Sequence, residues 1–454
     1  MNFLVFLAMF GWIPLTIYLF NKFPASQAVI IGFIAAWLFL PQAEFPLPGL
    51  PDYTKISATC YGILLASFLF DYGRFNRFQF SILDIPIVIW CICPFFSSIT
   101  NDLGLYDGLT AVVSQTMTWG IPYFLGRVYL NNLSGLRNLS LGIFLGGLIY
   151  IPLCLFEVRM SPQLHRMIYG YHAHSFAQTI RMGGFRPTVF MQHGLEVGMW
   201  MMAASLIGIW LWKTNCVKQV YGISMSWVIL ALVVTFLAVK SFGAYLLLLL
   251  GITILFIAWQ FNTSITILLL MLSITFYLGQ NAMTQEHIAE IVVSPLERVF
   301  PEERISSLQF RINNEILLKD KAQQKMIFGW GGWGRNRVYD YNWKGELVDV
   351  SVTDSLWILA FGVNGLVGLI SLFSTFIFSI VGFITEYPSY TWSRKEVAPV
   401  AALAVVLILY LLDCLLNYMI NPIFILACGG ISGLVVKTKE FKSNAKTGAK
   451  VVQR

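Results

Sequence analysis

Apolar runs of about 15–22 residues, the length that crosses a hydrocarbon core of roughly 30 Å, recur along almost the whole sequence. Only 12% of the residues are charged and 57% are hydrophobic, whereas an average soluble domain has about 25% charged residues. The pattern predicts an all-α polytopic integral membrane protein with about 12–13 transmembrane helices. We place the runs at 3–20, 25–41, 56–70, 85–99, 109–130, 138–157, 194–212, 220–239, 241–259, 263–279, 355–385, 397–416 and 420–436.

Lys and Arg in the short loops predict the orientation, because such loops stay on the cytoplasmic side. If every run crosses once, the basic short loops share one face with the basic tail 437–454. The last two runs also allow one span plus a re-entrant piece. The predicted organisation is N-terminal transmembrane helices 1–157, a basic extracytoplasmic loop 158–193, transmembrane helices 194–279, a large, partly helical extracytoplasmic loop 280–354, C-terminal transmembrane helices 355–436 and a basic cytoplasmic tail 437–454.

The predicted loop 158–193 departs from the positive-inside rule. It holds four arginines and four of the five histidines but no Asp or Glu. One interpretation is a missed span, which makes this loop cytoplasmic. The other is an anion site at the outer membrane surface, where low dielectric strengthens contacts between Arg and phosphate oxygens. We predict Glu157 and Glu196 as partners of these arginines.

The second predicted outer loop is polar, because residues 280–350 contain ten acidic and nine Lys or Arg side chains. Within it, Ile305, Leu308, Ile312 and Ile316 recur at helical spacing, which predicts an amphipathic helix. Its apolar face packs on the bundle or rests in the headgroup layer. Arg311 lies beside this face and points either to solvent or into a site.

A glycine- and tryptophan-rich segment follows this helix. Four glycines between residues 328 and 334 free the backbone for tight turns or for close approach to a ligand. Two Trp faces and two Arg side chains offer stacking surfaces and anion contacts for a ligand. An anchor at the membrane interface explains the same residues equally well. The residues concerned are Trp330, Trp333, Arg335 and Arg337.

The order of the motifs in residues 180–435 resembles the O-antigen ligase and O-antigen polymerase superfamily of bacterial membrane glycosyltransferases. The matching features are Arg311 on a helix, the Phe-Gly-Trp-Gly of 328–331, and Asp354-Ser355 followed after nine residues by the Gly-x-x-Gly of 365–368. Upstream, the segments 184–187 with Arg186 and 192–194 with His193 resemble the family's other Arg-bearing motif. Lys240-Ser241 falls where many members have Ser-Arg. Asp354 departs from the family, which has His there.

The resemblance implies a multi-pass protein of the bacterial inner, cytoplasmic membrane, without nucleic-acid partner, cofactor or metal. It implies an undecaprenyl-diphosphate-linked glycan as donor and a glycan or lipid-linked acceptor, among membrane lipids. Arginines then stabilise the departing diphosphate, because a guanidinium grips phosphate oxygens with two parallel bonds. We predict Arg186 and Arg311 as catalytic, and His193, Lys240, Arg335, Arg337, Trp330 and Trp333 as substrate-binding.

Asp354 is the third predicted catalytic residue. It can accept the acceptor hydroxyl proton if desolvation raises its pKa, or it can orient an arginine or a sugar hydroxyl. The alternative is a helix cap before Ser355. His193 is the nearest candidate for the chemistry of the missing histidine. Asp413, Asn417 and Asn421, at i, i+4 and i+8, are predicted to share one helix face inside the bundle.

Three function classes remain at this point. The first is a glycosyltransferase that polymerises or transfers undecaprenyl-diphosphate-linked glycans of O-antigen, capsule or exopolysaccharide. The second is a transporter, such as a lipid-linked oligosaccharide flippase, which the lack of matching broken spans in the two halves disfavours. The third, a receptor or scaffold, leaves the arginines without a role.

Overall fold

A computed structural model describes residues 2–47, 50–181, 183–284 and 302–452. The chain is 72% helical, and the described residues include eight helices long and apolar enough to cross a membrane. The predicted all-α polytopic membrane protein is thereby confirmed, while its exact number of crossings remains a prediction. The eight are α1 (Phe3–Lys22), η2 with α4 (Ile82–Thr100), α7 (Leu133–Met160), α9 (Gly194–Lys213), α11 (Phe242–Phe261), α12 (Ile265–Met283), α15 (Leu356–Glu386) and α17 (Pro422–Val452, polar after Val436).

Shorter helices complete the bundle. Four are apolar helices of 10–17 residues: α2 (Ala25–Phe39), α3 (Lys55–Phe70), α10 (Met225–Ala238) and α16 (Ala398–Asp413). The predicted run 109–130 is a continuous stretch made of α5 (Leu105–Gln115), the π-helical turn η3 (Thr116–Gly120) and α6 (Ile121–Tyr129). The last two predicted runs form two separate helices, α16 and α17. The remaining helical pieces are η1 (Tyr72–Arg77), η2 (Ile82–Asp84), α4 (Ile85–Thr100), α8 (Leu164–Tyr169), η4 (Phe176–Thr179), α14 (Glu302–Gln323) and η5 (Ser389–Thr391).

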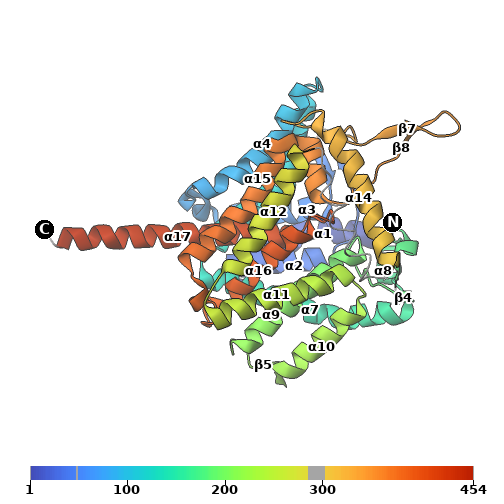
Figure 1. The fold of residues 1–454 in the computed structure, drawn as a ribbon. Coiled ribbons are helices and arrows are strands. Elements are labelled where there is room, and N and C mark those ends of the chain that lie inside the picture. The colour runs from blue at the N-terminus through green and yellow to red at the C-terminus, as the bar shows by residue number, and fades with distance from the viewer. Residues whose placement is uncertain (1, 48–49, 182, 285–301, 453–454) are drawn as a thin grey trace.

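The described strands form four separate antiparallel pairs in the connections between helices. Figure 1 shows the β7–β8 hairpin projecting beyond α14, while the end of α17 projects from the opposite side. The pairs are β1 (Phe45–Leu47) with β2 (Leu50–Tyr53), β3 (Ile180–Arg181) with β4 (Gly184–Phe185), β5 (Gln219–Val220) with β6 (Ile223–Ser224), and β7 (Tyr339–Tyr341) with β8 (Leu347–Asp349).

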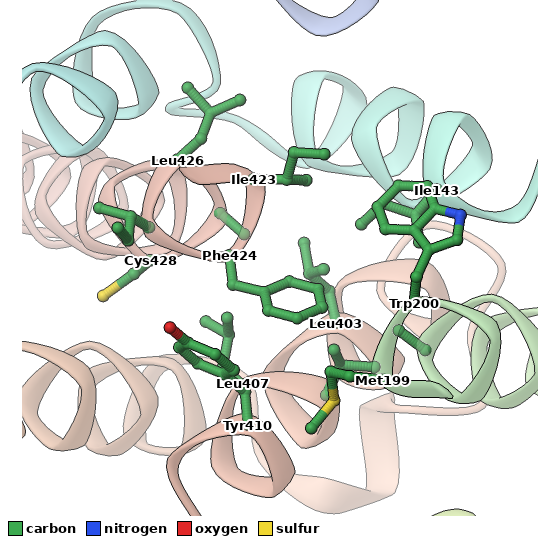
Figure 2. Close-up of a cluster of buried hydrophobic side chains, with 14 of the residues drawn as sticks. Ile143, Met199, Trp200, Leu403, Leu407, Tyr410, Ile423, Phe424, Leu426 and Cys428 are labelled. Carbon is green, nitrogen blue, oxygen red and sulfur yellow. The ribbon is translucent and has the colours of Figure 1, made fainter. Parts of the chain in front are cut away.

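The core lies where α16 meets α7, α9 and α17. Every residue of α16 from Ala398 to Leu411 is buried, because this helix is surrounded by its neighbours. Figure 2 shows Tyr410 of α16 beside Phe424 of α17, with Trp200 of α9 nearby. By contrast, α1 and α12 leave large apolar side chains exposed, such as Leu272 at 65%. Apolar side chains facing away from the bundle are what a lipid-facing helix requires.

Helices α6 and α17 pack backbone against backbone. A Cβ on Gly126 would lie 2.0 Å from the carbonyl oxygen of Leu426, and one on Gly429 would lie 2.0 Å from that of Tyr123. Only glycine permits this approach, and small residues at helix contacts are a usual source of packing in membranes. The contact ties the N-terminal half of the bundle to its last helix.

Helix α15 is broken at Gly365, where φ is +66° and ψ is −164°. The break leaves backbone groups without intrahelical partners, and the segment 326–331 supplies them. Trp330 N–H donates to the Gly362 carbonyl oxygen at 2.8 Å, and Leu366 N–H donates to that of Met326 at 2.8 Å. The backbone of the glycine-rich segment therefore forms a wedge at the break in this transmembrane helix. Because the helix is interrupted there, the predicted run 355–385 can be longer than one ordinary span.

The amphipathic helix predicted within the polar loop is α14. Ile312 and Leu318 are buried, so this part of the helix packs on the bundle. The side chains of Ile305 and Leu308, and the loop residues 285–301, lie outside what the structure describes.

Candidate functional site

The loop 158–193 folds around a buried carboxylate. Glu157, near the end of α7, is fully buried and accepts the N–H groups of Leu164, Thr188 and Val189 at 2.8–2.9 Å. Glu196 of α9 accepts the N–H of Gln192 at 3.1 Å and interacts electrostatically with Lys55. The predicted pairing of these two glutamates with the loop arginines is therefore wrong. Backbone N–H groups bind Glu157, and a backbone N–H group and Lys55 interact with Glu196 instead.

Arg186 is held under the loop, directly after β4. Its side chain is only 5% exposed, and Nε and Nη2 donate to the Lys240 carbonyl oxygen at 3.3 and 3.1 Å. Its stem crosses Gly194 at the start of α9, where a Cβ would lie 2.3 Å from the Arg186 Cδ. Glycine at this position makes room for the guanidinium to reach the connection between α10 and α11.

Lys240 stands in that connection in a strained conformation. Its φ is +56°, a left-handed value that residues other than glycine rarely adopt. Its Nζ lies against β4, close enough that a Cβ on Gly184 would be 2.1 Å away. Non-glycine residues in this region cost free energy and cluster at functional sites, so the strain accords with the predicted binding role.

His193 caps helix α9 as a neutral ring. Nδ1 accepts the Leu195 N–H at 3.1 Å, so Nε2 carries the proton in the neutral tautomer and faces Gln178 Oε1 at 3.0 Å. Burial, followed by the charges of Arg186, His174, Arg181 and Arg311 in that order, lowers the pKa of His193 to about 4. With Nδ1 occupied and so low a pKa, His193 is a poor replacement for a catalytic histidine base and is better suited to positioning.

Arg311 reaches from α14 to the connection between α16 and α17. Nη1 donates to the Leu416 carbonyl oxygen at 3.2 Å and to Asn417 Oδ1 at 3.0 Å. Asn417 Nδ2 in turn donates to Asp413 at 2.7 Å. Because α16 ends at Asp413, the prediction that Asp413, Asn417 and Asn421 share one helix face is wrong; a turn, not a helix, brings Asn417 back to Asp413.

Asp354 lies beside Arg311, with its Oδ2 at 3.9 Å from the arginine Nε. Burial raises the pKa of Asp354, and the positive charge of Arg311 opposes that rise. The cap position of α15 is occupied by Ser355, whose side chain makes no capping hydrogen bond. Asp354 is thus one residue outside the cap position and is paired with the predicted phosphate-binding arginine.

These residues form one group, which we call the cationic cluster: Arg181, Arg186, His193, Lys240 and Arg311. Arg181, Arg186 and Arg311 all act on the charge of His193, and Lys240 contacts Arg186 directly. The basic loop, the α10–α11 connection and α14 therefore converge at one end of the bundle. Asp354 and Asp413 border the cluster at Arg311.

The other predicted binding residues form a second group on the glycine-rich segment and the β7–β8 hairpin. Trp330 donates through Nε1 to the Lys321 carbonyl oxygen at 2.7 Å, and the Lys321 ammonium lies 4.0 Å from its ring centroid. Trp333 is 82% exposed and donates to Asp107. Arg335 donates to the Gly332 carbonyl oxygen at 3.0 Å.

A cavity of about 310 Å³ opens beside this second group. Trp333, Arg337 and Tyr339 line it together with Leu359 and Val363 of α15. Arg337 is already paired with Asp349 at 2.7 Å. Burial raises the pKa of Asp349, but the hydrogen bonds from Arg337 and Ser351 and the charge of Arg337 together lower it below its ordinary value. Arg335 and Arg337 therefore bind within their own loop, whereas the stacking surface of Trp333 is open.

Sequence reasoning missed a buried acid one turn after Arg311. Glu315 accepts the Tyr277 hydroxyl at 2.6 Å and the Trp357 Nε1–H at 3.2 Å, and burial raises its pKa to about 7. The sequence feature that could have identified Glu315 is its i+4 spacing from Arg311, which places both side chains on one side of α14. Glu315 joins α14 to α12 and α15 and so holds Arg311 in place.

The candidate site is thus an arginine-rich cluster bordered by two carboxylates. Among the described residues, no three His, Cys, Asp or Glu side chains gather as metal ligands would. Comparison with protein-family models and with curated proteins finds no match to this chain.

Proposed function

We propose that this chain is a membrane glycosyltransferase that polymerises or transfers undecaprenyl-diphosphate-linked glycans, such as O-antigen, capsule or exopolysaccharide, on the outer side of the bacterial inner membrane. The observation that carries the proposal is that Arg186, bound to the Lys240 carbonyl oxygen, and Arg311 both lie within electrostatic range of His193. These two arginines come from motifs far apart in sequence, and both motifs resemble those of the ligase and polymerase superfamily. An arginine-lined site suits a diphosphate, which is the leaving group of such a donor.

In the proposed reaction, an acceptor hydroxyl oxygen attacks the anomeric carbon of the donor sugar. The new glycosidic C–O bond forms as the bond from that carbon to the diphosphate oxygen breaks, and the electron pair leaves with undecaprenyl diphosphate. Arg186 and Arg311 stabilise the charge that grows on the diphosphate. Lys240 and Arg181 add positive charge to the same cluster.

Asp354 takes the proton of the acceptor hydroxyl. Its raised pKa favours proton uptake, and its long contact of 3.9 Å with Arg311 leaves the carboxylate in reach of a second partner. When Arg311 turns to the diphosphate, Asp354 loses part of the charge that stabilises its ionised form. Binding of the donor therefore makes Asp354 a stronger base.

The proposed topology places residues 158–193 and 280–354 on the outer side, with each predicted apolar run crossing once. Helix α15 supports it, since it begins beside Asp354 and ends at Glu386, which pairs with Lys442 in the basic tail. The part of α15 that follows the break at Gly365 spans roughly 30 Å by itself, enough for the two ends of α15 to face different sides of a membrane.

The test uses purified protein, an undecaprenyl-diphosphate-linked glycan and an acceptor glycan. We expect Arg311→Ala to lower turnover about 100-fold or more, as loss of a charge-stabilising donor does. Arg311→Lys keeps the charge but not the planar fork, so we expect it to remain at least about tenfold impaired. The control is Arg394→Ala, an exposed arginine in the connection between α15 and α16.

Arg186→Ala is the second arm, with folding checked by size-exclusion chromatography because Arg186 is buried. Full turnover in both the Arg186 and the Arg311 variants contradicts the proposed mechanism. Translocation of the lipid-linked glycan in liposomes without covalent product contradicts the enzyme and supports the flippase.

A further inference from the structure

A cavity of about 470 Å³ lies at the opposite end of the bundle from the cationic cluster. It is lined by η1 with the residues that follow it, by the end of α6 and by α17. Lys442 of α17 pairs with Glu386 at the far end of α15, whereas the start of α15 lies beside Asp354 and Arg311. The lining residues are Asp71, Gly73, Arg74, Arg77, Phe78, Gln79, Arg127, Val128, Asn131, Val436, Lys437 and Glu440.

Four cations and two acids line this cavity. Arg127 is buried and fixed by Asp84, with Nε and Nη2 donating to the two carboxylate oxygens at 2.7 and 2.9 Å. Arg74 pairs with Asp71 at 2.9 Å. Lys437 donates to Asn131 at 2.7 Å and lies within electrostatic range of Arg74 and Arg127. Arg127 and Arg74 are thus neutralised by their own carboxylates. The charge open to an anion comes from Arg77 and from Lys437, which Glu440 partly offsets.

Arg77 differs from these three cations, because its side chain has no such ion pair or hydrogen bond with the described residues. Arg77 is also exposed. A planar guanidinium with unused donors at the mouth of a cationic cavity matches the oxygens of a phosphate group.

The surroundings of the cavity indicate how that phosphate is carried. Phe70 and Phe80 flank η1 and Tyr72 begins it; these three side chains are 49%, 61% and 54% exposed, respectively. Aromatic side chains exposed beside basic residues are typical of the membrane interface. Basic pockets between helices on the cytoplasmic side suit phospholipid headgroups, and the basic short loops place this end of the bundle there.

We propose that this cavity binds the phosphate of an anionic phospholipid headgroup, with the acyl chains along the exposed aromatic side chains. The proposal shares the orientation of the bundle with the glycosyltransferase proposal but none of its residues, because it uses the other end of the bundle.

The experiment compares lipid retention by the purified chain in nanodiscs of phosphatidylcholine containing a small fraction of labelled phosphatidylglycerol. The test variant is Arg77→Ala combined with Lys437→Ala, and the matched control is Arg394→Ala combined with Lys395→Ala, two exposed residues outside the cavity. We expect about tenfold weaker retention of phosphatidylglycerol in the test variant, as loss of charged hydrogen bonds implies, and no change in the control. The elution profile checks that both variants fold.

A parallel arm adds inorganic phosphate alone and follows thermal unfolding. Stabilisation by inorganic phosphate without preference for phosphatidylglycerol over phosphatidylcholine overturns the lipid assignment. Equal retention of phosphatidylglycerol by the test and control variants overturns the site itself.

Discussion

At the scale of single residues, the sequence predicted several members of the cationic cluster, and their chemical roles stay a proposal. Arg186, Lys240 and Arg311 were predicted from motifs, and the structure brings them together. Glu315 was missed, because its burial depends on Tyr277 and Trp357, which come from two other helices. Trp330, Arg335 and Arg337 were predicted beside the same site. Arg335 and Arg337 instead bind within their own loop and Trp330 binds α14 and α15, since spacing along a chain does not report which way a loop turns.

Asp354 leads to a prediction of pH dependence. A carboxylate accepts a proton only when ionised, and burial shifts the pKa of Asp354 upward, so ionisation needs a higher pH than for an exposed aspartate. We expect turnover to rise with pH through this pKa and then level off. Asp354→Asn removes the rise and lowers the plateau by about 100-fold, whereas Asp354→Glu keeps a rise, measured as initial rates of glycan transfer.

The control for Asp354 is Asp340→Asn, an exposed aspartate of β7. His193, with a pKa of about 4, is neutral above that pH and contributes to the rise only near pH 4. Glu315, with a pKa of about 7, can. A rise that disappears in Glu315→Gln and persists in Asp354→Asn would show that the base has been assigned to the wrong residue.

At the scale of elements, the break in α15 is the feature that composition concealed. The apolar run 355–385 predicts one tilted span, because a glycine within an apolar run does not by itself indicate a break in the helix. What makes Gly365 different is the backbone of segment 326–331, which pairs with the broken turn from outside the helix. Periodicity along one segment carries no information about such a partner.

Gly365→Ala tests the importance of this break. The backbone conformation at Gly365 is nearly restricted to glycine, and an added Cβ would lie 2.2 Å from the Ile327 carbonyl oxygen. We expect the substitution to lower the free energy of unfolding by ~1–3 kcal/mol, measured by thermal unfolding in detergent. Gly279→Ala in α12, where nothing lies within 4 Å, is the control and leaves stability nearly unchanged. If both variants are equally stable, the pairing of segment 326–331 with the break at Gly365 does not stabilise the protein as we propose.

Across the whole molecule, apolar composition alone predicted the architecture. A chain with 57% hydrophobic residues hides them in a bundle or presents them to lipid, and the described helices do both. Hydropathy also indicated the last two helices, and helical spacing of apolar residues indicated the helix of the polar loop. Neither pattern reports the side of the membrane on which a loop lies, which depends on the bias of positive charge.

Cysteine labelling tests the sidedness. Six of the seven cysteines are buried and Cys216 is half-buried, so a Cys216→Ser background leaves little reactive thiol. In this background we expect Lys344→Cys, in the β7–β8 hairpin, to react with an impermeant thiol reagent added to intact cells. Lys439→Cys, in α17, should react only after the membrane is opened. Labelling of both from outside, or the reverse pattern, contradicts the proposed orientation.

The wedge at Gly365 also bears on how such a protein can diverge. Its anchoring bonds join main chain to main chain, so they survive most side-chain replacements in the neighbouring hairpin. Side chains of the hairpin can therefore be replaced while the transmembrane scaffold stays unaltered. The exposed surface of the hairpin is thus free to vary during evolution on a constant membrane frame.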